Sequence, residues 1–107
     1  MTYEQATRIY QAIEATNNEM RLDLYWAALR YAVIRVEWFL SSQENRREME
    51  ARRTSAHNVV VDAINVLVRN LAKEGQDVSW RQEIPDDRKA VGDFAVLLSA
   101  HLGILAR

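Results

Sequence analysis

The chain of 107 residues has no cysteine, one proline and only three glycines. The lack of cysteine excludes disulfides, thiolate metal sites and cysteine nucleophiles, although it does not fix the cellular compartment. Few residues break helices, and no segment alternates apolar and polar residues for long enough to make a half-buried strand. We therefore expect an all-α fold, a four-helix bundle-like single domain over residues 1–107.

An excess of charge of either sign is also missing. The 14 basic and 15 acidic residues give a net charge of −1, so no global field attracts nucleic acid or an anionic membrane surface. The N-terminal residues do not show the basic segment and apolar run of a secretory signal. The sequence thus predicts a cytoplasmic protein with no nucleic-acid partner and no membrane partner.

Capping residues predict the bounds of the first two helices. Thr2 and Gln5 have the spacing of a capping box, so the first helix begins at Thr2. It ends at residues 17–18, two asparagines that tolerate left-handed backbone. The second helix is expected over about residues 20–40. Its inward face is predicted to be the side on which five apolar residues recur: Leu22, Leu29, Val33, Val36 and Leu40.

The boundary between the second and third helices has two interpretations. Ser41 and Glu44 have capping-box spacing, which favours a new helix that begins there. Alternatively, one helix continues to Arg53 and breaks at residues 54–55. In both cases the segment 43–53, with three glutamates and four arginines, is predicted to be a solvated helical surface.

The C-terminal third of the chain also carries start and stop signals. Gly75 suits the left-handed cap position, so the third helix is expected to end there. Ser79 and Gln82 have capping-box spacing, which predicts a short helical turn before the last helix. Asp86 or Asp87 then caps the last helix, which is expected to run almost to the C-terminus.

A line of polar residues runs along the otherwise apolar third helix. Successive residues are about 100° apart around a helix axis, which places four polar residues in one narrow strip: Asn58, Asp62, Asn65 and Arg69. Apolar residues cover the rest of the arc and predict a central helix. The strip has three interpretations. It is a solvent face, a buried network in which Asp62 and Asn65 meet Arg69, Arg81 or Arg88 and which fixes helix register, or a ligand pocket that also uses Arg88 and Asp93.

Motifs of enzyme chemistry are missing from the sequence. There is no HExxH, no repeated ExxH, no glycine-rich phosphate loop and no metal-binding carboxylate loop. The two histidines, His57 and His101, do not form a compact metal-binding pair with the carboxylate on their own helix, so we interpret them as core or interface residues. We predict no catalytic residue, no metal and no cofactor.

The last helix has no charged residue from Phe94 through Ala106. A monomer normally leaves one face of each helix to water, so this helix predicts a protein interface. It is too short to cross a bilayer, which takes about 20 residues. Aromatic residues of the second helix are expected to add to the interface. The predicted interface residues are Tyr31, Trp38, Phe94, Leu97, Leu98 and Leu105.

These features favour a homodimer that acts through protein contacts, as an interaction or regulatory module, with a further protein partner as an option. The alternative is a small enzyme or ligand-binding protein whose polar pocket lies between the third and fourth helices. The surplus of apolar surface supports the first hypothesis, and the polar strip supports the second.

Overall fold

The computed structural model describes residues 1–105, without the side chains of residues 104 and 105. Its elements are, in order, α1 (Tyr3–Thr16), α2 (Arg21–Leu40), α3 (Gln43–Lys73), the 3-10 turn η1 (Ser79–Glu83) and α4 (Arg88–Leu105). The described residues contain no strand. The predicted all-α, bundle-like fold with a helical turn before its last helix is confirmed.

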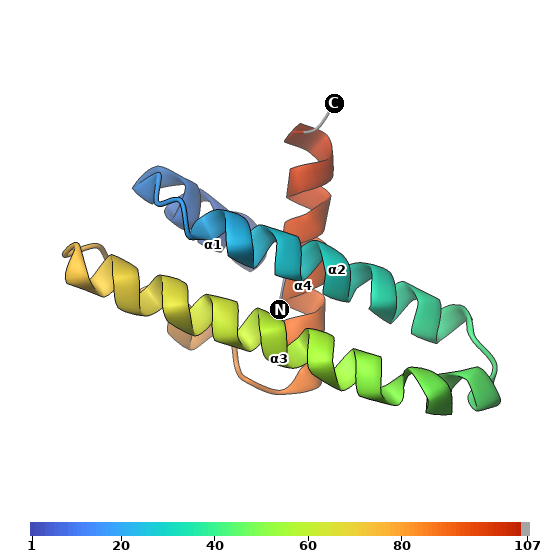
Figure 1. Ribbon diagram of the computed structural model, residues 1–107. Coiled ribbons are helices and arrows are strands. Elements are labelled where there is room, and N and C mark those ends of the chain that lie inside the picture. Colours follow the sequence, from blue (N-terminus) through green and yellow to red (C-terminus); the bar gives the residue numbers. More distant parts are fainter. Residues whose placement is uncertain (106–107) are drawn as a thin grey trace.

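Helices α2 and α3 lie side by side and run in opposite directions, joined by a short turn (Figure 1). Helix α4 crosses this pair steeply and packs mainly on α2, while α1 packs against α4 and η1. Helix α2 is therefore the element that contacts both α3 and α4. The core lies among its inward face, α4, the facing side of α3 and the buried residues of α1 and η1.

The predicted caps of α1 are confirmed. The Gln5 amide donates to the Thr2 hydroxyl at 3.1 Å, and the Thr2 amide donates to the Gln5 side chain at 2.8 Å. Asn17 ends the helix with a left-handed φ of 51°. Both signals are local, which is why the sequence alone was enough to read them.

Helix α3 begins one residue later than predicted. Ser42, and not Ser41, is its N-cap and accepts from the Asn45 amide. The Ser41 hydroxyl donates instead to the Glu37 carbonyl at 2.6 Å, at the end of α2. The alternative of one helix running to Arg53 is wrong, because the chain turns before α3.

The predicted end of α3 is confirmed at Gly75, whose φ is +73°. The Gly75 amide donates to the Ala72 carbonyl and the Gln76 amide to the Leu71 carbonyl, the pattern of a Schellman cap. The turn η1 is capped differently from the prediction, because the Asp77 carboxylate accepts from both the amide and the hydroxyl of the serine that follows two residues later.

The start of α4 matches the prediction. The Asp87 carboxylate accepts from the Ala90 amide at 2.8 Å, and its carbonyl accepts from the Val91 amide. Asp87 is thus the cap, and Asp86 lies in the preceding loop.

The inward face of α2 is the opposite of the predicted one. The buried residues of this helix are Leu24, Tyr25, Ala27, Ala28, Tyr31, Ala32 and Ile34. Of the predicted stripe, Leu29 is half-buried and the other four residues are exposed. Both faces are apolar, and the face with three alanines is the one that lets neighbouring helices approach closely, so it packs inward.

Helix α3 is not central, contrary to the prediction. Its second half buries one stripe of residues at spacings of three and four: Ala56, Val60, Ile64, Leu67 and Leu71. Val59 and Val66 remain more than two-fifths exposed. A single buried stripe is the pattern of a surface helix that packs by one face.

Candidate interaction surface

The polar strip of α3 lies at the molecular surface. Asn58, Asp62 and Arg69 are exposed, and Asn65 is half-buried. Three of the four side chains therefore face water, as in the first of the three interpretations of this strip.

Asn65 joins a network through Arg81 of η1, one of the arginines predicted as its partner, and Asn58 Oδ1 lies 3.2 Å from His57 Nδ1. The Arg81 Nε donates to Asn65 Oδ1 at 3.2 Å, and the same guanidinium donates to the Ile84 carbonyl and the Asp86 carboxylate. The His57 Nε2 lies 3.1 Å from the Asp86 carbonyl. These bonds fasten the segment between α3 and α4 to the surface of α3, which is a structural task.

The other two predicted pocket residues lie elsewhere. Arg88 donates to Glu50 and to the Thr54 hydroxyl, near the start of α3. Asp93 forms an ion pair with Arg35 of α2, with 2.9 Å between the carboxylate oxygen and the guanidinium nitrogen. The six residues of the predicted pocket thus divide among separate places and do not line one site between α3 and α4.

A polar cluster that the sequence analysis missed joins α1 to α2. The Tyr25 hydroxyl donates to Glu14 Oε2 at 2.6 Å, and the Arg21 Nε donates to the same oxygen at 2.7 Å. Burial raises the pKa of Glu14, but the hydrogen bonds from Tyr25 and Arg21 outweigh it and hold that pKa below its ordinary value. Burial, followed by the bond to Glu14, raises the pKa of Tyr25.

Asn18 forms a second missed contact. Its buried side chain donates to Asn70 Oδ1 at 2.6 Å and to Glu74 Oε1 at 3.0 Å. Asn18 therefore fastens the turn between α1 and α2 to the C-terminal end of α3. The 52-residue separation of Asn18 and Asn70 explains why no local pattern predicted this bond.

His101 connects α4 to α1. Its ring stacks between those of Tyr3 and Tyr10, with centroid distances of 5.1 Å and 5.0 Å. Its Nε2 lies 3.0 Å from the Thr7 hydroxyl. The described residues include no group of three histidine, aspartate or glutamate side chains placed to hold a metal ion.

Three predicted interface residues lie in the core. Tyr31, Phe94 and Leu98 are each at most 1% exposed. They are large and apolar, and the crossing of α4 over α2 surrounds them with the other buried residues of the chain. Placing them at an interface was wrong, because a side chain buried within its own chain offers no surface to a partner.

The other three predicted interface residues differ from one another. Trp38 is half-buried, and two guanidiniums lie over its ring, those of Arg46 at 4.3 Å and Arg53 at 4.0 Å from the ring centroid. Leu97 is half-buried on the wall of a surface groove. The side chain of Leu105 lies outside the described part of the chain.

An exposed apolar line runs the whole length of α2. Its six residues, at successive spacings of four and three, are called here the α2 seam: Leu22, Trp26, Leu29, Val33, Val36 and Leu40. Leu29 is half-buried, and the other five expose 49%, 74%, 57%, 52% and 82% of their surface. This is the heptad spacing with which helices pair in coiled coils.

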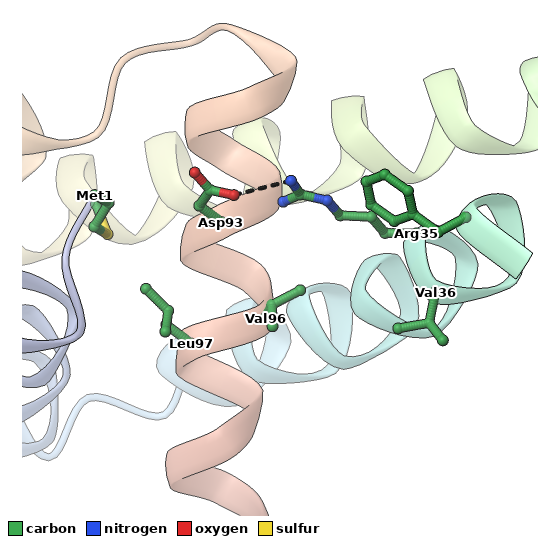
Figure 2. Close-up of a pocket in the computed structure, with 7 residues that line it drawn as sticks. Met1, Arg35, Val36, Asp93, Val96 and Leu97 are labelled. Atoms are coloured by element: carbon green, nitrogen blue, oxygen red, sulfur yellow. Dashed lines mark ion pairs between the residues drawn. The ribbon is translucent and has the colours of Figure 1, made fainter.

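The seam continues onto α4 through two adjoining grooves. A groove of about 490 Å³ is lined by Met1, Arg35, Val36, Phe39, Asp93, Val96 and Leu97. Figure 2 shows Val96 and Leu97 on α4 beside the Arg35–Asp93 ion pair, with Val36 on the neighbouring helix. A second groove, of about 430 Å³, shares Val36 and Val96 with the first. The apolar surface of α2 and that of α4 are therefore continuous.

No protein-family model, curated protein or solved structure matches this chain. None of the helices within residues 1–105 has both the length and the apolar character needed to span a membrane.

Proposed function

We propose that this protein is a homodimeric protein–protein interaction module, and that the α2 seam, with Phe39 and Val96 beside it, is the contact surface. The observation that carries the proposal is the exposure of seven large apolar side chains on one continuous surface. Together they expose an area on the order of 800 Å², about what each partner of a stable interface buries. The largest apolar patch of a typical monomer is about 300–600 Å².

A second copy of the chain suits the seam because the spacing is self-complementary. When two α2 helices pair antiparallel about a two-fold axis near residue 31, Leu22 faces Leu40 of the second copy. In the same register Trp26 faces Val36, and Leu29 faces Val33. All six seam positions then find an apolar neighbour, as the heptad pattern requires.

The charges beside the seam oppose this register weakly. Asp23, Arg30 and Glu37 follow one flank at seven-residue spacing, so Arg30 lies near Arg30 of the second copy and Asp23 lies near its Glu37. Exposed charge pairs contribute up to about 1 kcal/mol. Fully burying a large apolar side chain contributes about 1.5–3 kcal/mol. The apolar contacts at Trp26 and Leu22 therefore outweigh the repulsion and favour the full-length register.

The proposal is tested by placing a charge on the seam. Val36→Glu puts a carboxylate opposite Trp26 of the second copy, within the contact, and should convert the dimer to a folded monomer. Val59→Glu is a matched control, since Val59 is also a partly exposed valine but lies on α3. Light scattering measures the mass, and circular dichroism checks that both variants keep their helices.

The expected result is a dimer at micromolar concentration for the unmodified chain and for Val59→Glu, and a monomer for Val36→Glu. A monomeric unmodified chain across the micromolar and millimolar ranges would contradict the proposal. If Val36→Glu and Val59→Glu both dissociate, the α2 seam is not specifically the contact surface.

A further inference from the structure

A cationic cavity lies beside the Arg35–Asp93 ion pair, near the end of α2. Its volume is about 320 Å³, and its lining residues are Tyr31, Arg35, Trp38, Phe39, Arg53, Arg88 and Lys89. Four of these side chains are cationic and three are aromatic. They come from α2, α3 and the first turn of α4, so the cavity exists only in the folded chain.

The positive charge around the cavity exceeds the negative charge. Asp93 pairs with Arg35 at 2.9 Å and lies 4.0 Å from Lys89. Glu50 pairs with Arg53 at 3.3 Å and with Arg88. Two carboxylates therefore contact four cations, which leaves the equivalent of two positive charges for a ligand.

The positive charges around the cavity also act on the Tyr31 hydroxyl. Burial raises the pKa of Tyr31, whereas the positive charges of Arg53, Arg35 and Arg88 oppose that rise. The three arginines therefore all lie close enough to act on one point of the cavity wall.

Three of the lining residues have a buried N–H group without a hydrogen-bond partner among the described residues: Arg35 Nη1, Trp38 Nε1 and Arg53 Nε. Such groups normally find an acceptor, because leaving one unpaired destabilises the fold. The side chains that carry these groups all line one cavity, so they have hydrogen-bonding capacity left for a ligand rich in acceptor oxygens.

The guanidiniums that line the cavity are held in place by their surroundings. Arg53 stacks on the Trp38 ring, and Arg35 lies 5.6 Å from the centroid of Phe39. Arg35 also lies against Gly92, where a Cβ atom would overlap the guanidinium. Planar guanidiniums in fixed positions are suited to bind phosphate oxygens in pairs.

We propose that this cavity binds the dianionic phosphate group of a small phosphate monoester. Arg35, Arg53 and Arg88 bind its oxygens, Lys89 adds charge at the entrance, and the rings of Trp38 and Phe39 contact the organic group. The cavity shares Phe39 with the surface proposed for the dimer contact, but none of its cationic residues belongs to the α2 seam. Variants at Arg53 and Lys89 therefore test phosphate binding independently of the dimer.

Inorganic phosphate and phenyl phosphate are the probes, titrated into the full chain and followed by calorimetry and by the NMR signal of the Trp38 indole N–H. Sodium chloride at equal ionic strength is the reference for unspecific salt effects. Both phosphates should shift the Trp38 signal, whereas chloride should not. Phenyl phosphate should bind more tightly, because it alone reaches the aromatic wall.

Three variants assign the binding to the cavity. Arg53→Gln should weaken phosphate binding about tenfold, the usual effect of losing one hydrogen bond to a charged group. Lys89→Gln changes a side chain that is 86% exposed and should weaken binding severalfold without affecting the fold. Arg69→Gln, an exposed arginine on the same helix as Arg53, should bind as the unmodified chain does.

If Lys89→Gln binds phosphate as tightly as Arg69→Gln does, the cavity is not the binding site. This comparison remains decisive even if Arg53→Gln fails to fold. A Trp38 shift that chloride reproduces would overturn it as well. If inorganic phosphate binds more tightly than phenyl phosphate, the proposal of a phosphate monoester is wrong and the free phosphate ion is the ligand.

Discussion

At the scale of single residues, the Glu14 carboxylate gives the fold a dependence on pH at both ends of the range. The pKa of Glu14 is lower in the folded chain than its ordinary 4.5, so its stabilisation is present above that value and is lost as the pH falls. The pKa of Tyr25 is raised above its ordinary 10.0. Its stabilisation is present below pH 10.0 and is lost as the pH rises and the unfolded chain releases the proton.

Tyr25→Phe tests this cluster. Removal of the hydroxyl takes a hydrogen bond from Glu14 and should lower the free energy of unfolding by about 1 kcal/mol at neutral pH. It should also reduce the loss of stability above pH 10.0, the ordinary pKa of the tyrosine. Urea unfolding at neutral and alkaline pH measures both effects. Tyr3→Phe, at a half-exposed tyrosine of α1, should change neither, and an equal effect of the two variants would disprove the role of the cluster.

Individual polar residues were the hardest to place from the sequence. Helical spacing put Asp62 and Arg69 on one strip correctly, but it could not say whether that strip faced water, because apolar residues flanked it on both sides. Arg81 was one of three arginines predicted as a partner for Asn65, and that bond is present. Asn18, in contrast, binds an unpredicted partner on another element, 52 residues away in sequence. No local pattern encodes such pairs, and the cationic cavity, drawn from three helices, was missed for the same reason.

At the scale of elements, the helix ends were predicted well and the helix faces less well. The caps at Thr2, Asn17 and Gly75 depend on contacts within a few residues, so their signals are complete in the sequence. Helix α2, in contrast, is apolar on two faces. Periodicity finds both faces but cannot choose between them, since the choice depends on how closely α3 and α4 can approach.

Gly75→Ala tests the end of α3. An alanine at φ +73° is strained, so the variant should be less stable by about 1–2 kcal/mol. Gly103→Ala is the matched control within a helix, where a Cβ meets nothing within 4 Å; it should stabilise the chain by about 0.5–1 kcal/mol. Thermal unfolding compares the two, and a neutral Gly75→Ala would show that the left-handed cap is not maintained in solution.

At the scale of the whole molecule, the surplus of apolar residues was visible in the sequence but was assigned to the wrong residues. The uncharged last helix predicted an interface, and α4 does expose Val96. Phe94 and Leu98 instead complete the core, because α4 crosses α2. The exposed apolar surface lies mainly on α2, so the tertiary arrangement moved the candidate interface from one helix to the other.

Cross-linking through single cysteines tests the antiparallel arrangement, and the cysteine-free chain makes each variant specific. Arg30 lies near the proposed two-fold axis, so Arg30→Cys should form covalent dimers with a short bismaleimide. Leu22→Cys should not, because in an antiparallel pair the two copies of residue 22 lie about 27 Å apart along the helices, at about 1.5 Å per residue. A parallel pair would join Leu22→Cys as readily as Arg30→Cys. Denaturing gel electrophoresis detects the covalent dimers. Cross-linking at both positions would exclude the antiparallel arrangement and would indicate a parallel dimer that uses the same seam.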